Sequence, residues 1–171
     1  MPERQGRRAR FCSNACRQRA YRARRSGVPE CMRERVRWVR WVERRRGAKM
    51  TKVPLSLSGH DLDVRDSRRW VSFEEARRSK VGTGFGIVLG GGLGCIDLDD
   101  CIVDGVVAEW AQGWIDGYRE DAVLIERSFS GEGVHIFLPM SEGPGRRIRD
   151  GVQNVEIYSR ERYIAVTGDR L

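Results

Sequence analysis

The sequence holds few cysteines and histidines and no long apolar run. Among its 171 residues are five cysteines and two histidines. Five widely spaced cysteines, an odd number, do not form the pattern of a secreted disulfide framework. No apolar stretch approaches the ~20 residues needed to cross a bilayer, and the Arg-rich start lacks the apolar segment of a secretory signal. We therefore expect a cytoplasmic protein with no membrane partner, of a length that suits one domain and an appendage.

Positive charge is concentrated at the N-terminus. Residues 1–50 hold 17 lysines and arginines against 4 acidic residues, whereas the remaining 121 residues hold 15 against 20. Such a basic block suits the phosphate backbone of nucleic acids. The alternative is a solvated face that aids solubility. The candidate nucleic-acid-binding residues are Arg17, Arg19, Arg22, Arg24 and Arg25.

This N-terminal part is expected to be helical. Residues 10–25 can form a basic helix, "SGVP" at 26–29 interrupts it, and a second helix is predicted from about Glu30 to Arg46. A stripe of valines and tryptophans in that second helix is expected to dock on a core. We accordingly divide the chain into a basic helical extension, residues 1–49, and a main domain, residues 50–171.

The main domain alternates short strands with a few helices. Ser72 and Glu75 form a capping box that starts a helix, and the Gly-rich turn in "FGIVLGGGLGCIDLD" predicts a β-hairpin. "VVAEWAQGWIDGY" predicts a helix with Val106 and Val107 among its inward residues. Strands are predicted in "AVLIERS", "GVHIFLP", "NVEIYS" and "RYIAVTG". This order predicts an α+β fold with a curved, mainly antiparallel sheet and flanking helices.

Three of the predicted strands carry polar residues within apolar runs. Side chains alternate along a strand, so Asp97 and Asp99 in "GCIDLDDC" share one face. Carboxylates are costly to bury unpaired, so this pair requires a cation, a basic partner or water. Hard divalent cations such as Mg²⁺ prefer these oxygen ligands. His135 in "GVHIF" and Glu156 in "VEIY" interrupt two other strands, and the four residues together indicate one site.

In order and spacing, these segments resemble the primase–polymerase (prim-pol) domain of the archaeo-eukaryotic primase superfamily, which is found in phage and plasmid replication proteins. The family is marked by an hDhD strand, a Ser…His turn and strand, and a late strand with an acid after an apolar residue. These motifs correspond here to "CIDLDDC", "ERSFSGEGVHIF" and "NVEIYSRERYIAVTG". The lead-in "RWVSFEEA" and "GTGFGIVLGGG" also resemble the family, and the match covers residues 50–171.

The resemblance implies a DNA primase or DNA polymerase that transfers nucleotides from NTPs or dNTPs to a primer 3′-hydroxyl on a DNA template. Asp97, Asp99 and Glu156 would hold two Mg²⁺ or Mn²⁺ ions, and His135 would contact the incoming triphosphate. A replicative helicase supplied by another chain is implied as a partner. The "SGEG" turn offers backbone amides to phosphates, although it is equally typical of an ordinary hairpin. The further implied nucleotide contacts are Ser130, Gly131, Gly133, Arg160 and Arg162, with Lys52 as an additional candidate.

The segment "FCSNACRQRAYR" resembles the second half of a small zinc-binding element. A structural zinc site needs four ligands, and this element contributes only Cys12 and Cys16, while Cys31 and His60 are poorly spaced for it. We therefore expect no zinc in this chain. Two other functions are compatible with the residues: a catalytically silent nucleic-acid-binding module, and a metal-dependent nuclease that uses the same carboxylates.

Overall fold

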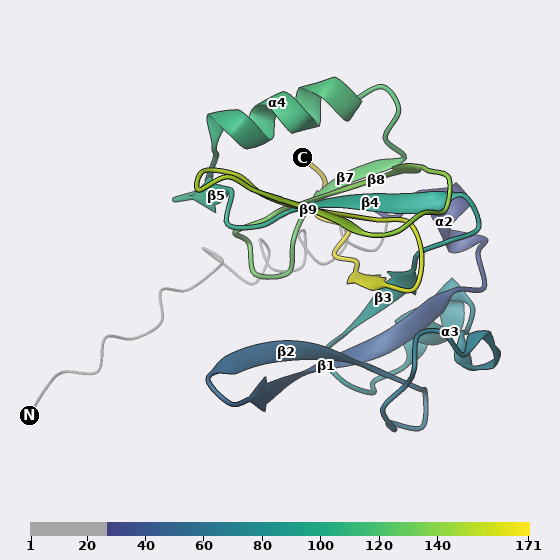
Figure 1. Cartoon of the computed structure of the whole chain (residues 1–171). Helices are drawn as coiled ribbons and strands as arrows, with labels where there is room; N and C mark the ends of the chain where they lie inside the picture. Colours follow the sequence, from purple (N-terminus) through teal and green to yellow (C-terminus); the bar gives the residue numbers. More distant parts are fainter. Residues whose placement is uncertain (1–26) are drawn as a thin grey trace, which may run out of the picture.

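The computed structural model describes residues 27–171. The helix expected over residues 10–25, with its five candidate arginines and with Cys12 and Cys16, lies outside the described residues. The described part is α+β, with antiparallel strands that curl into a half-barrel and few helices (Figure 1). The expected α+β class and antiparallel pairing are therefore confirmed, although the strands form two main sheets rather than one. Across residues 27–171 the helices are too short and too polar to cross a bilayer.

The first sheet has four strands in the order β11-β3-β1-β2. These strands are β1 (Trp38–Arg46), β2 (Lys49–Leu55), β3 (Gly84–Val88) and β11 (Tyr163–Ala165). Three short helical segments accompany it: α2 (Glu30–Arg33), η1 (Ser67–Arg69) and α3 (Phe73–Arg78). The expected capping box is confirmed, because the Ser72 hydroxyl accepts from the Glu75 amide and the Glu75 carboxylate accepts from the Ser72 amide.

The second sheet has five strands in the order β7-β8-β4-β10-β9, and α4 covers one of its faces (Figure 1). Its strands are β4 (Leu93–Leu98), β7 (Leu124–Arg127), β8 (Val134–Pro139), β9 (Arg146–Arg149) and β10 (Asn154–Tyr158). Ile96, Leu98 and Ile136 pack against Ala111 and Ile115 of α4 (Glu109–Tyr118). Alternation along each strand leaves the other face of this sheet turned toward the first sheet.

The core between the two sheets occupies only part of their facing surfaces. Cys95 and Phe137 of the second sheet pack in one cluster with Trp38 and Ile87 of the first sheet and with Leu89, which directly follows β3. Each of these side chains is at most 2 % exposed. Farther along the same strands, polar side chains replace the apolar ones, and this is where the candidate site lies.

The helix expected over residues 30–46 is wrong beyond Arg33. Residues 38–46 form β1, which is paired on both sides, with β2 and with β3. Valines and tryptophans three residues apart imitate a helical stripe, but β-branched and aromatic residues favour strands. Residues 38–41 are all buried because Trp38 faces one cluster and Val39 faces another on the opposite side of the sheet. A strand covered on both faces loses the period-2 alternation that would have identified it.

Strand β1 also joins the start of the described chain to the rest. The boundary expected after residue 49 falls at the β1–β2 hairpin, and Met32 and Trp38 lie in the same core as Ile87. Residues 27–49 are therefore part of the main structural unit and not a separate extension.

The β-hairpin expected over residues 85–99 is also wrong, because β3 and β4 belong to different sheets. The three glycines between them, Gly90, Gly91 and Gly92, all have positive φ, so they carry the chain across from one sheet to the other. Arg37 donates to the carbonyls of Val88 and Leu89 and holds this crossing in place. The segment preceding α4 forms a small ribbon, β5 (Ile102–Val103) with β6 (Val106–Val107), and Val106 is exposed rather than inward.

Candidate active site

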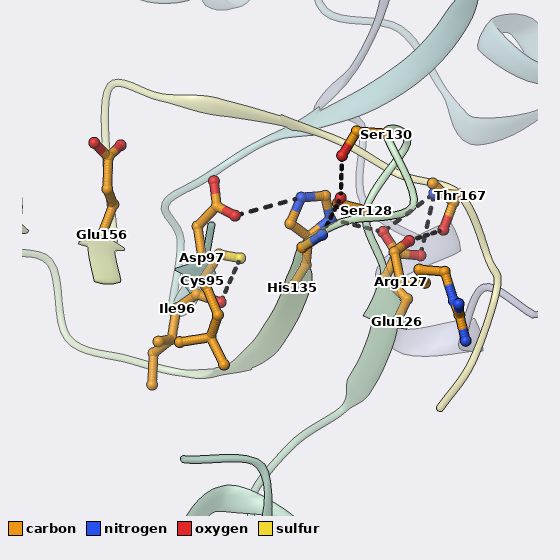
Figure 2. A network of polar contacts seen from close by, with 12 residues as sticks. Cys95, Ile96, Asp97, Glu126, Arg127, Ser128, Ser130, His135, Glu156 and Thr167 are labelled. Atoms are coloured by element: carbon orange, nitrogen blue, oxygen red, sulfur yellow. Dashed lines mark hydrogen bonds and ion pairs between the residues drawn. The ribbon is translucent and has the colours of Figure 1, made fainter. Parts of the chain in front are cut away.

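A row of polar side chains crosses the second sheet on the face opposite α4. The register places Glu126 of β7 opposite His135 of β8, His135 opposite Asp97 of β4, and Asp97 opposite Glu156 of β10. Arg147 of β9 lies opposite Glu156 and completes the row. Residues paired across antiparallel strands have their side chains side by side, so residues as far apart in the sequence as Asp97 and Glu156 meet here (Figure 2). The structure thus brings together Asp97, His135 and Glu156, as the sequence predicts.

His135 lies between two carboxylates and is almost completely buried. Its Nδ1 lies 3.1 Å from Glu126 Oε1, and its Nε2 lies 3.6 Å from Asp97 Oδ1. An ionised carboxylate only accepts, so Nδ1 carries the proton donated to Glu126. Burial opposes the charged imidazolium, but the hydrogen bond to Glu126 and the charges of Asp97 and Glu126 outweigh it and raise the pKa of His135. The ring is therefore oriented by Glu126 and biased toward its cationic form.

Glu126 is a member of the site that the sequence analysis missed. Its carboxylate is fully buried and accepts from the Thr167 amide at 3.1 Å and from the Gly168 amide at 2.6 Å, in addition to His135. These bonds tie the segment after β11 to the histidine. The available signal is weaker than for His135: Glu126 directly follows the apolar run "AVLI" and precedes Arg127, whereas His135 has apolar residues on both sides.

Asp99 lies in the turn after β4, because the strand ends at Leu98. Its amide still donates to the Asn154 carbonyl at 2.9 Å, which keeps the turn beside β10. Burial, followed by the negative charges of Asp97 and Glu156, raises the pKa of Asp99 to about 6. The three predicted carboxylates are thus close enough to repel one another, although Asp99 is held by a turn rather than by the strand.

Glu156 is surrounded by positive side chains. Its Oε1 lies 2.9 Å from Arg147 Nε and 3.4 Å from Arg149 Nη2, and its Oε2 lies 3.7 Å from Arg162 Nη2. The Tyr158 hydroxyl donates to Oε2 at 2.7 Å. Sequence reasoning singled out Arg162 but missed Arg147 and Arg149, because it did not recognise β9 as a strand.

The donor set of this site suits a hard divalent cation. Carboxylate oxygens are the ligands that Mg²⁺ and Mn²⁺ prefer. Burial is the main cause of the raised pKa of Asp99, and the negative charges of Asp97 and Glu156, which a cation would relieve, add to it. Within residues 27–171, however, no three His, Cys, Asp or Glu side chains are arranged as a metal-binding group. Both oxygens of Glu156 already have partners in Arg147 and Tyr158. A cation bound by all three carboxylates would therefore require Glu156 to exchange those partners.

A cleft of about 590 Å³ opens over Asp97 and His135. Its opposite wall comes from the first sheet and its neighbouring segments, with Lys52 on β2 and with Arg162 and Tyr163 around the start of β11. This volume is in the range of small-molecule sites. The positive charge of Lys52 reaches His135, where it opposes protonation. Asp97 and His135 line one wall of the cleft, and the other wall carries Lys52 and Arg162 together with the carboxylates of Asp63 and Glu161.

The turn over residues 128–133 contributes less than the resemblance implies. The amides of Gly131, Glu132 and Gly133 already donate to Ser128 and Ser130 within the turn, so they are not free to bind phosphate. Ser130 itself is exposed and its hydroxyl lies 3.0 Å from that of Ser128 (Figure 2). Arg160 is also exposed and is not among the residues that line the cleft.

Cys95 and Cys101, which flank Asp97 and Asp99, are both buried core residues, as expected.

No family model matches this sequence, and comparison with curated proteins finds no match either, so the function has to be argued from the residues and geometry of this site.

Proposed function

We propose that the chain is a nucleotidyltransferase that extends DNA, a primase or polymerase that joins NTPs or dNTPs to a primer 3′-hydroxyl. One observation carries the proposal. The carboxylates of Asp99 and Glu156 lie close to that of Asp97, and Asp97 lines a cleft whose far wall carries Lys52 and Arg162. Phosphoryl transfer from a triphosphate requires oxygen ligands for cations together with positive groups for the phosphates, and this cleft supplies both.

Each side chain has a role that follows from its surroundings. His135 is held by Glu126, which also raises its pKa, and it binds the triphosphate through a hydrogen bond that its cationic form strengthens. Lys52 and Arg162 neutralise phosphate charge from the opposite wall. Asp97, Asp99 and Glu156 would hold two Mg²⁺ or Mn²⁺ ions, which when bound lower the pKa of the attacking hydroxyl and stabilise the charge on the transferred phosphoryl group. A substrate phosphate also offers Arg147 a new partner when Glu156 turns to a cation.

The cations of the far wall favour synthesis over hydrolysis of DNA. A nuclease needs charge complementarity to one phosphodiester, whereas a nucleotidyltransferase must bind three adjacent phosphates of its nucleotide. His135, Lys52 and Arg162 offer positive groups to these phosphates from both sides of the cleft, although Asp63 and Glu161 also line its far wall.

The test is extension of a labelled primer–template by the full chain with Mg²⁺ or Mn²⁺, with dNTPs and NTPs compared. We expect metal-dependent extension that Asp97→Asn reduces at least about 100-fold, because it removes a charge that acts on the reacting centre. Asp121→Asn, an exposed carboxylate in the loop after α4, is the matched control and should retain activity. Shortening of the DNA without extension would indicate a nuclease. DNA binding with neither extension nor shortening would indicate a catalytically silent module. Either result contradicts the proposal.

A further inference from the structure

The β1–β2 hairpin extends beyond the sheet that it belongs to. Strand β3 pairs only with residues 38–41 of β1, whereas β2 pairs with β1 as far as Arg46. Residues 42–53 therefore form a two-stranded projection, which we call the basic ribbon. In Figure 1 its tip points away from the other strands of its sheet and lies below the five-stranded sheet.

The tip of the basic ribbon is exposed and strongly positive. Residues 43–50 are all exposed, and they include Arg44, Arg45, Arg46 and Lys49 against the single acid Glu43. Arg44 forms an ion pair with Asp61. Within residues 27–171, no carboxylate lies at ion-pair distance from the other three cations, so most of this charge is uncompensated.

One cross-strand pair shows that the charge does not serve the fold. Arg46 lies directly opposite Lys49 at the end of the ribbon. Like charges in this arrangement destabilise an antiparallel pair. The protein therefore keeps an unfavourable contact at an exposed tip, and an anionic partner would turn that contact into a favourable one.

The shape of the basic ribbon favours a duplex over a single strand. Proteins that bind single-stranded nucleic acid stack bases on aromatic side chains, and residues 43–50 contain none. A two-stranded β-ribbon fits the major groove of B-DNA, about 12 Å wide. Alternation places Arg45 on one face of the ribbon and Arg44 and Arg46 on the other. Cations on both faces match the two phosphate backbones that border a groove.

The basic ribbon also leads into the candidate site. Met50, Thr51 and Lys52 line the same cleft as Asp97 and His135. We propose that residues 43–50 dock on the phosphate backbones of double-stranded DNA and hold a primer–template beside this cleft. The inference relies on the proposed function only for the identity of the duplex, and its test does not require catalysis.

The test measures binding of the full chain to a labelled primer–template duplex by fluorescence anisotropy, without nucleotide and with EDTA, over a range of salt concentrations. The variant is Arg45→Gln/Arg46→Gln/Lys49→Gln, which leaves the Arg44–Asp61 pair in place. The matched control is Arg33→Gln/Arg78→Gln/Arg119→Gln, which removes the same charge from exposed positions on or beside three different helices, none of them lining the cleft.

Each phosphate contact contributes about 0.9 to the slope of log affinity against log salt. Loss of three contacts should lower the slope by up to about 2.7, so that raising salt from about 50 to 200 mM weakens wild-type binding about 40-fold more than binding of the ribbon variant. The control variant should keep the wild-type slope. The melting temperature of the ribbon variant should be no lower than that of the wild type, because the Arg46–Lys49 repulsion is removed.

Three outcomes would overturn the inference: an unchanged slope in the ribbon variant, an equal loss of slope in the control, or an equal loss of slope on single-stranded DNA. The outcome is separable from that of the proposed function. Loss of slope in the ribbon variant of a chain that extends no primer would support the ribbon alone. Primer extension by the wild type with an unchanged slope in the variant would support the function alone.

Discussion

Substitution of Glu126 by Gln tests whether the buried carboxylate determines the state of His135. The carboxylate accepts from three donors: His135 Nδ1 and the amides of Thr167 and Gly168. A glutamine side chain offers one acceptor oxygen and an NH₂ group that only donates. At least one of the three donors would then face another donor in a fully buried position.

The cost follows from the kind of contact that is lost. A hydrogen bond to a charged group contributes about 1.5–3 kcal/mol, and removing one partner of a buried ion pair costs about 3–5 kcal/mol. We expect Glu126→Gln to lower the free energy of unfolding by about 3–5 kcal/mol, a large part of the ~5–15 kcal/mol typical of a domain. Urea denaturation at constant pH measures this change.

The same substitution should lower the pKa of His135, because the hydrogen bond and the charge of Glu126 both raise it. A raised folded-state pKa stabilises the fold fully below the unfolded value of about 6.5, and this contribution is lost as the pH rises through the folded pKa. The stability of the wild type should therefore fall as the pH rises through and above that window, and the fall should be smaller in Glu126→Gln. NMR titration is direct, because the chain has only two histidines, and the His135→Gln variant assigns their signals.

A double-mutant cycle with His135→Gln separates the histidine from the two amides. If Glu126 acts on His135, the cost of Glu126→Gln should shrink once the imidazole is gone. Additive costs, or an unchanged His135 titration in Glu126→Gln, would refute the assigned coupling.

Two further predictions concern the turn residues of the site. Asp99→Asn should melt at a higher temperature than the wild type in EDTA at pH 8, and this difference should shrink toward pH 4, because a carboxyl whose pKa is raised to about 6 destabilises the fold as it ionises. Mg²⁺ should stabilise the wild type more than this variant. A variant that melts below the wild type at pH 8 would contradict the assignment. Gly133→Ala should lower the free energy of unfolding by about 1–3 kcal/mol, because its Cβ would lie 2.7 Å from the Leu98 carbonyl oxygen. Gly113→Ala, in the open middle of α4, is the control and should raise the free energy of unfolding by up to about 1 kcal/mol. Equal effects of the two substitutions on chemical denaturation would rule out the close approach of Gly133 to the Leu98 carbonyl.

Under the proposed function, the arginines around Glu156 would link the unbound site to the site with nucleotide and cation bound. Arg147 and Arg149 come from β9, an edge strand of the second sheet, and both remain largely exposed. Their contacts with Glu156 compensate a carboxylate whose side chain is only 8 % exposed. Because they are anchored on the edge, they can turn toward phosphates without disturbing the core. We therefore expect nucleotide and cation binding to be coupled through Glu156.

The sequence by itself determined the local features whose cause lies within a few residues. The capping box at Ser72 and Glu75 starts α3, and the apolar strands around His135 and Glu156 are where alternation indicates them. Alternation also identified Asp97, His135 and Glu156 as polar residues within apolar strands. Burying such groups is costly whatever position the strand takes in the sheet, so their presence indicates a site. The prediction that they form one site needed only that their strands be neighbours.

Only the tertiary structure decided which faces were covered and which strands were paired. Residues 38–46 became a strand because β2 pairs along most of the segment and β3 pairs with residues 38–41. Burial of residues 38–41 on both faces removed the alternation that a sequence pattern depends on. The Gly-rich segment after β3 looks like a hairpin turn, but partners distant in the chain, β1 and β10, assign β3 and β4 to different sheets. Glu126 and Arg147 joined the site for the same reason. Strand pairing is a non-local interaction, so the register that aligns five polar residues across one sheet is set by strands far apart in the sequence.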